Sequence, residues 1–176
     1  IGEGKMPTSV PHAASCALEP ILKQGRELIA WDSPKPADGD WRIGRGVAII
    51  MQKSGIPDID QANCMVKLES DGTFIVHSGG ADIGTGLDTV VAKLTAEVLH
   101  CPLGDVHVVS GDTDHALFDK GAYASSGTCF SGNAAKKAAE NLKEKILFHG
   151  AAMLGEPLAD VELAFPGVVR GKLGEV

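Results

Sequence analysis

Two clusters of small residues have the composition and the position to bind an anion. The first spans residues 79–86 (GGADIGTG) and the second spans residues 121–128 (GAYASSGT), and each directly precedes a segment with helical periodicity. Consecutive small residues at a helix start leave backbone N–H groups accessible, and the helix dipole adds partial positive charge there. Taken alone, such a cluster is more often a tight turn than a ligand site.

The first cluster matches neither of two common nucleotide-binding motifs. It lacks the Lys-Ser/Thr pair of a Walker A loop, and Thr89 stands where the third glycine of a Rossmann fingerprint belongs. If the two helix starts converge, their N–H groups and hydroxyls form a cradle that suits an elongated polyanion better than a hydrophobic ligand. A shared cradle and two independent turns both remain open on the residues alone.

Three other polar groups favour structural roles. Residues 111–115 (GDTDH) lack calcium-loop spacing and a second helical His, so a loop with Asx-type hydrogen bonds is preferred over a metal site. Glu156 lies in a glycine turn, but the same phrase recurs without Glu after the preceding helix, so Glu156 is interpreted as structural. Ser125 and Ser126 have no nearby His in the sequence, and no hydrolase nucleophile is predicted.

The segments around the clusters predict an α+β fold, with β-hairpins, a mixed sheet and two long helices. Residues 46–51 form an apolar run that predicts a buried strand, and residues 65–69 and 73–77 flank a Ser-Asp-Gly turn that is typical of a hairpin. The other predicted elements are a helix with Leu87, Val91, Leu94 and Val98 on one face, a strand over residues 106–109, a helix with Phe130, Ala134, Ala138, Leu142 and Ile146 on one face, and a closing hairpin over residues 161–163 and 168–169.

The strand, turn and helix unit occurs twice. A similar eight-residue sequence follows each predicted helix, at residues 99–106 and again at residues 154–161. This predicts a half-repeat of about 55 residues, with too few copies for a solenoid.

Residues 1–42 are predicted to form an N-terminal arm and linker, and residues 43–176 the main domain. Prolines punctuate the arm, one helix is predicted over residues 17–29, and residues 32–40 are interpreted as an exposed linker. The apolar side chains of the arm are expected to stay exposed unless another part of a larger protein covers them. These side chains are Ile21, Leu22, Leu28, Ile29 and Trp31.

Composition narrows the possible partners. The net charge is −7 with no Lys/Arg run, which argues against nucleic acid and anionic membranes. No apolar run is long enough to span a membrane, and the first residues do not resemble a secretion signal. The four cysteines lack metal or redox spacing, so free, buried thiols in a reducing cytoplasm are predicted. The sequence opens on Ile1 rather than Met, and we expect it to come from a longer protein.

Four segments carry a resemblance to a known family. They are residues 44–48 (GRGVA), residues 79–86 with Thr89, residues 111–114 (GDTD), and residues 121–128 with Gly132, Asn133 and Ala134. In order and spacing they resemble the molybdopterin-binding subunit of the molybdenum hydroxylases, also called the xanthine dehydrogenase and aldehyde oxidase family. The resemblance covers about residues 44–150.

In that family, two strand-to-helix turns of this kind grip the pterin and its phosphate. The resemblance therefore implies that molybdopterin with molybdenum, in its cytosine dinucleotide form, contacts Ile83, Gly84, Thr85, Gly86, Ala124, Ser125, Ser126 and Gly127. It also implies hydroxylation of an aldehyde or N-heterocycle with oxygen from water. Iron–sulfur centres and FAD are expected on other subunits or domains, alongside the remaining molybdopterin-binding portions.

The sequence departs from the family pattern in three ways. Thr85 stands where Gln is usual, which leaves a hydrogen bond to the cofactor unmade or made through water. Ser125-Ser126 replaces a common Ser-Arg pair. The family's catalytic Glu belongs to a glycine-rich motif that does not occur before Val176, so no catalytic residue and no metal ligand is assigned. The chain is expected to be a middle fragment or split subunit that is inactive alone.

Two other functions stay open on the sequence. One is a stand-alone, non-catalytic α+β module that binds another phosphate-containing ligand. The other is a structural or assembly domain without ligand binding, for which Thr85 is the one hint.

Overall fold

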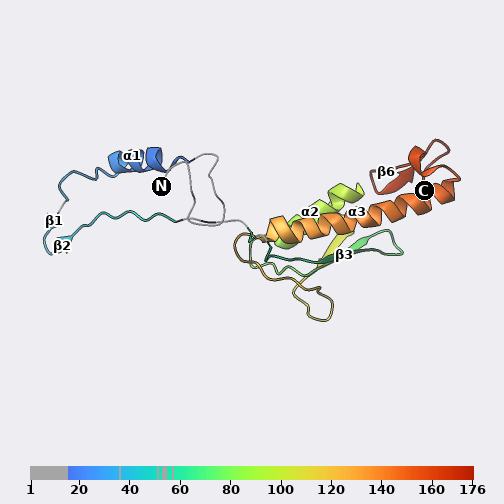
Figure 1. The fold of residues 1–176 in the computed structure, drawn as a ribbon, viewed down its shortest axis with the longest axis horizontal. Helices are drawn as coiled ribbons and strands as arrows, with labels where there is room; N and C mark the ends of the chain where they lie inside the picture. The colour runs from blue at the N-terminus through green and yellow to red at the C-terminus, as the bar shows by residue number, and fades with distance from the viewer. Residues whose placement is uncertain (1–15, 36, 51, 53–54, 57) are drawn as a thin grey trace. The chain divides into compact units, whose positions relative to one another are not determined.

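The chain forms two compact units. This computed structural model describes residues 16–35, 37–50, 52, 55–56 and 58–176. Residues 1–50 belong to one unit and residues 51–176 to the other, which contains both small-residue clusters. Figure 1 gives the order of the elements along the chain.

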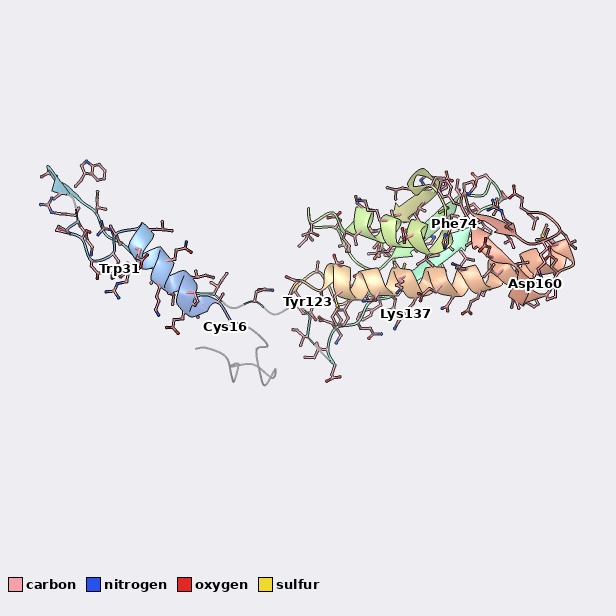
Figure 2. All side chains as sticks on the ribbon, turned by 90° about the horizontal axis from the view of Figure 1, so that it is seen from above. Cys16, Trp31, Phe74, Tyr123, Lys137 and Asp160 are labelled. Atoms are coloured by element: carbon pink, nitrogen blue, oxygen red, sulfur yellow. The ribbon has the colours of Figure 1, made fainter. Side chains whose placement is uncertain are left out.

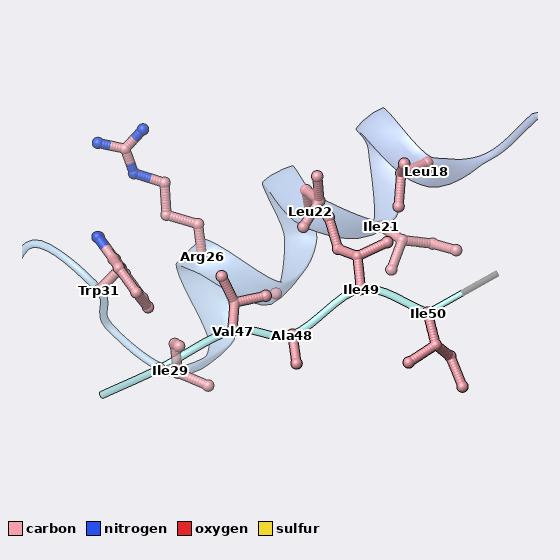
Figure 3. A pocket seen from close by; sticks show the side chains of 12 residues that line it. Leu18, Ile21, Leu22, Arg26, Ile29, Trp31, Val47, Ala48, Ile49 and Ile50 are labelled. Atoms are coloured by element: carbon pink, nitrogen blue, oxygen red, sulfur yellow. The ribbon is translucent and has the colours of Figure 1, made fainter. Parts of the chain in front are cut away.

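The first unit is built on one helix. α1 (Leu18–Leu28) confirms the helix predicted over residues 17–29, and a short hairpin follows, formed by β1 (Ala37–Asp38) and β2 (Trp41–Arg42). The next residues run beside α1 without forming a strand (Figure 3). The buried strand predicted over residues 46–51 is therefore wrong for residues 46–50, and Met51 lies outside the described residues. Ile50 is 89% exposed, because the described part of this unit offers α1 as a neighbour and no second layer.

The apolar side chains of the arm remain exposed, as expected. No residue of α1 is buried, and Ile21, Leu22, Leu28, Ile29 and Trp31 are between 37% and 79% exposed. Together with residues 46–50, several of them line an apolar cavity of about 640 Å³ (Figure 3).

A three-stranded mixed sheet forms the base of the second unit. β3 (Cys64–Leu68) and β4 (Phe74–Ser78) pair antiparallel, which confirms the predicted hairpin. Asp71 closes the turn between them by accepting hydrogen bonds from the N–H and hydroxyl of Thr73. β5 (Val106–Val109) then pairs parallel with β4, and the strand order is β3-β4-β5.

Two helices pack against each other and against this sheet. α2 (Leu87–Leu99) contacts β5 and α3 (Gly127–Leu154) contacts β3, and the two helices lie side by side (Figure 1). The core at this interface includes Val76, Val91 and Leu99, each fully buried. These elements confirm the α+β class.

The buried face of α3 lies one position away from the predicted one. Ser131, Ala135 and Ala139 are buried, together with Gly132, Gly150 and Ala151, whereas the predicted stripe through Phe130 and its four-residue repeats is only partly buried. Small side chains let α3 approach α2 closely: a Cβ at Gly132 would lie 3.0 Å from Leu94 Cδ1. The apolar pattern alone did not reveal that small residues form this contact. Further along the helix, Leu142 and Ile146 do pack partly buried against the core, as predicted.

The sequence that recurs after each of the two helices, α2 and α3, has the same local structure in both copies. Each helix ends in a left-handed residue, His100 or Gly155, followed by Pro and a short 3-10 helix, η1 (Leu103–Asp105) or η2 (Leu158–Asp160). The predicted closing hairpin is confirmed as β6 (Glu162–Ala164) and β7 (Val168–Arg170). The structural reading of Glu156 is also confirmed, because its carboxylate accepts hydrogen bonds from the N–H groups of Lys172 and Leu173.

All four cysteines are free thiols, but they are not all buried. Cys101 is buried, Cys16 and Cys64 are partly buried, and Cys129 is exposed near the start of α3, so the prediction of buried thiols is wrong for Cys129. Desolvation raises the pKa of Cys64 to about 11. Among the described residues, no helix has the length and apolarity needed to cross a membrane.

Candidate functional site

The two small-residue clusters meet because β4 and β5 are parallel neighbours. Their carboxyl ends lie at the same edge of the sheet, so the turn from β4 to α2 and the loop from β5 to α3 leave from that edge. Both segments line one cavity of about 230 Å³. Its lining residues are Ile83, Thr85, Leu87, Ala122, Ser125, Ser126, Gly127 and Thr128.

The cavity brings together most of the residues predicted to form the site. Ile83 and Thr85 line it from the first turn, and Ser125, Ser126 and Gly127 line it from the second. The other three predicted residues, Gly84, Gly86 and Ala124, belong to these turns without lining the cavity. Contact of any of these residues with a cofactor stays a prediction.

The sequence reading missed three lining residues, Leu87, Ala122 and Thr128, as cofactor contacts. Each flanks a predicted turn, and extending both predicted turns into the adjoining residues would have included them. The lining consists of hydroxyl, backbone and apolar groups and contains no titratable side chain. Its chemistry therefore suits holding a ligand rather than transferring protons.

Asp82 occupies the backbone donors of the first turn. Its Oδ1 accepts hydrogen bonds from Gly84 N at 2.9 Å and Gly86 N at 3.1 Å, and its Oδ2 accepts one from Asp88 N at 3.3 Å. The expectation that this turn leaves its N–H groups accessible to an anion is therefore wrong for these three groups. The sequence did contain a signal for these hydrogen bonds, because Asp82 stands two residues before Gly84, a spacing that is typical of an Asx turn.

The ionised form of Asp82 is favoured by these contacts. Desolvation alone raises the pKa of this carboxyl, but hydrogen bonds from the N–H groups of Gly84, Asp88, Gly86 and Thr85 outweigh it and lower the pKa below its usual value. The first turn thus already contains a negative charge at neutral pH.

The second turn is held in a strained conformation. Ala124 and Ser125 both have positive φ, 48° and 54°, in the left-handed region that costs a non-glycine residue about 1 kcal/mol or more. Residues that precede β3 hold them there: Gly55 N donates to Ala124 O at 2.7 Å, and Gln52 Nε2 donates to Ser125 Oγ at 3.3 Å. Strain of this kind concentrates at ligand-binding sites.

Asp119 fixes the loop that leads into this turn. Its Oδ1 accepts a hydrogen bond from Gly121 N at 2.7 Å, and its Oδ2 accepts one from the hydroxyl of Ser131 at 3.0 Å. The loop is thereby tied to the first turns of α3. Figure 2 shows Tyr123 beside the start of this helix and Lys137 further along it.

The start of α3 keeps open donors, in contrast to the first turn. In the described part of the chain, no protein group accepts a hydrogen bond from the N–H of Gly127 or Thr128, and Ser126 does not cap the helix with its side chain. Both residues line the cavity. The helix dipole adds partial positive charge at the same place.

The loop over residues 111–115 adopts the Asx-type structure that was predicted. Asp112 accepts hydrogen bonds from Asp114 N and approaches His115 Nδ1 at 3.1 Å. The ring of His115 stacks on that of His77, with the ring centres 6.0 Å apart. Within the described residues, no group of three or more His, Cys, Asp or Glu side chains is arranged to hold a metal ion.

Comparison with known proteins gives one family. The sequence matches the molybdopterin cofactor-binding domain over residues 24–175. It is 86% identical over all 176 residues to the probable hypoxanthine oxidase XdhD of Escherichia coli K12, and spans 18% of that protein. It is 35% identical over 156 residues, 85% of this chain, to the putative xanthine dehydrogenase molybdenum-binding subunit XdhA of the same strain, and spans 21% of it.

Solved structures with the same local fold come from related proteins. Quinoline 2-oxidoreductase from Pseudomonas putida 86 matches with a TM-score of 0.59 and 26% identity, over 65% of this chain and 14% of that one. Carbon monoxide dehydrogenase from Oligotropha carboxidovorans matches with a TM-score of 0.59 and 28% identity, over 64% of this chain and 14% of that one. This chain therefore spans about a fifth or less of the length of these proteins.

Proposed function

Because the chain belongs to the family of molybdopterin cofactor-binding domains, we propose that the cavity between its two turns holds part of the molybdopterin cofactor, in contact with residues 83–86 and 124–127. The observation that carries this proposal is the convergence of both turns on one cavity. Gly127 and Thr128 line this cavity, and no described residue accepts a hydrogen bond from their N–H groups. Within this proposal, residues 43–176 supply the binding portion and residues 1–42 an arm.

The residues of the cavity fit such a ligand in charge and in size. Its lining offers hydroxyls and backbone donors for which no described residue is an acceptor, and it carries no carboxylate that would repel a phosphate. Its volume of about 230 Å³ is smaller than the roughly 300–1,000 Å³ of a complete small-molecule site, so it suits one portion of an elongated cofactor. The cytosine dinucleotide form is the elongated polyanion that we propose.

The residues of this domain bind and orient the cofactor in the activity that we propose. That activity is the hydroxylation of an aldehyde or N-heterocycle with oxygen from water, by a larger enzyme of the xanthine dehydrogenase type. When bound, the cofactor supplies the two-electron redox chemistry. Ser125 and the start of α3 would donate hydrogen bonds to it, and Thr85 would present a hydroxyl from the opposite turn. Ser126 would support the second turn instead, because its hydroxyl donates to Gly121 O and its N–H donates to Tyr123 O.

We place the electron-accepting groups and further contacts outside this domain. Iron–sulfur centres and FAD on other subunits or domains would carry the electrons away, and other molybdopterin-binding portions would complete the site. The four free cysteines fit a reducing compartment, and the cytoplasm is the location that we propose.

Filling the cavity tests this function. Thr128→Trp places a large side chain at an exposed lining position of α3, where the backbone is helical. In the molybdenum holoenzyme that contains this domain, we expect the pterin content to fall to about a tenth or less of the wild-type value, which requires binding to weaken by at least about 1.4 kcal/mol. The pterin would be measured by fluorescence after oxidative release.

A matched control separates blocking from unfolding. Lys137→Trp places the same side chain at an exposed position further along α3, outside the cavity (Figure 2). This variant should keep its pterin, and both variants should keep the wild-type melting temperature. Wild-type pterin content in the Thr128→Trp enzyme would contradict the proposed site.

A further inference from the structure

We propose that Asp82 is a positioning residue, which holds the first turn in the conformation that presents Thr85 to the cofactor. This inference rests on the proposed function, and it adds a role for a side chain that does not line the cavity. Asp82 would act through backbone hydrogen bonds rather than by touching the ligand.

The hydrogen bonds of Asp82 bracket Thr85. Asp82 Oδ1 accepts the N–H groups of Gly84 and Gly86, the two neighbours of Thr85, at 2.9 and 3.1 Å. Both glycines have positive φ, 94° and 77°, a conformation that glycine leaves easily because it has little steric preference. Without an acceptor for these N–H groups, the turn would have many alternative conformations. One carboxylate oxygen therefore restricts the backbone on both sides of Thr85.

The second carboxylate oxygen joins this turn to the start of the loop that follows β5. Asp82 Oδ2 accepts the N–H of Asp88 at 3.3 Å, and Asp88 Oδ2 in turn accepts a hydrogen bond from the hydroxyl of Ser110 at 2.9 Å. Ser110 directly follows β5, where the loop toward the second turn begins. The path from Asp82 through Asp88 to Ser110 thus connects the two segments that line the cavity.

A preformed turn lowers the entropy lost when the ligand binds. A flexible glycine turn must be ordered at the moment of binding, and that ordering weakens affinity. The negative charge of Asp82 also fills the position that a phosphate would otherwise take. An uncharged portion of the cofactor should therefore meet Thr85, while its phosphate lies nearer the open donors of Gly127 and Thr128.

Two substitutions of Asp82 remove its hydrogen bonds to different extents. In Asp82→Asn, the side-chain oxygen can still accept from Gly84 and Gly86, but the amide nitrogen cannot accept from Asp88. In Asp82→Ala, every hydrogen bond to this carboxylate is lost. In the holoenzyme, we expect the rate of pterin release to rise in the order wild type, Asp82→Asn, Asp82→Ala, with the Ala variant about tenfold faster than wild type.

Hydrogen–deuterium exchange gives a readout that does not depend on activity. The N–H groups of residues 84–88 should exchange about tenfold faster in Asp82→Ala than in wild type, with Asp82→Asn in between. Asp71→Ala is the matched control for Asp82→Ala, because Asp71 also accepts an N–H two residues later but lies in the β3–β4 turn. This control should speed exchange only near residue 73 and leave pterin release unchanged.

The results separate this inference from the function on which it rests. Wild-type exchange and wild-type pterin release in Asp82→Ala would overturn the role of Asp82, and so would an equal loss of pterin in Asp71→Ala. The absence of pterin from the complete wild-type enzyme would contradict the proposed function. In that case, the exchange of residues 84–88 would still decide whether Asp82 holds the turn.

Discussion

At the scale of single residues, two carboxylates hold in place the backbone segments that lie next to the cavity. Asp82 accepts the backbone donors of the first turn, and Asp119 ties the second loop to α3 through Gly121 and Ser131. The glycines and serines of both turns were recognisable from their types and spacing. The hydrogen bonds of Asp82 were not, because several backbone conformations of a glycine-rich segment are compatible with the same sequence.

The contribution of Asp82 to stability should depend on pH. Its pKa in the folded chain is lowered from 3.8, so its stabilising effect is complete above the pKa of the unfolded chain and is lost as the pH falls through the lower folded value. The difference in free energy of unfolding between wild type and Asp82→Asn should be constant from pH 7 to about pH 5 and shrink below about pH 4. Urea unfolding at a series of pH values measures it. A difference that stays the same down to pH 2 would contradict this assignment.

At the scale of elements, the sequence predicted the helices and hairpins that depend on residues close together in the chain. The hairpin of β3 and β4, helices α2 and α3, and the closing hairpin of β6 and β7 all follow from turn residues and periodicity. The prediction of a buried strand was wrong for residues 46–50, because an apolar run does not indicate whether a second layer of structure will cover it. The convergence of the turns needed the parallel pairing of β4 and β5, which is a long-range contact that the sequence does not reveal.

The turn after β4 approaches α2 and α3 so closely that Gly80 is intolerant of a side chain. A Cβ at this position would lie 2.8 Å from both Leu87 Cδ2 and Ser131 Oγ. Gly80→Ala should therefore destabilise the domain by about 1–3 kcal/mol, as overpacking does in other cores. Gly104→Ala is the control, because nothing lies within 4 Å of its added Cβ. Equal melting temperatures for the two variants would show that this packing is looser than the structure indicates.

At the scale of the whole molecule, the two units differ in how well they bury their apolar residues. The second unit has a continuous core around Val76, Val91 and Leu99, whereas α1 buries none of its residues. The proline spacing and apolar content of residues 1–42 predicted an arm with exposed apolar side chains, and the side chains of α1 are exposed in the structure.

The 176-residue chain should not retain molybdenum when it is produced alone. Its cavity of about 230 Å³ suits one portion of the cofactor, and no residue of its lining is a typical ligand for the metal. Elemental analysis of the purified chain should therefore find far less than one molybdenum per molecule. Near-stoichiometric metal would mean that this chain makes more of the cofactor site than the two turns provide.

The measurement that tests the central claim most directly is an experimental structure of the holoenzyme with its cofactor bound. We predict that cofactor atoms lie within hydrogen-bonding distance of the N–H groups of Gly127 and Thr128, with Thr85 on the opposite side of the same ligand. A cofactor bound in the holoenzyme away from both turns, with the cavity between them filled by protein or solvent, would contradict it.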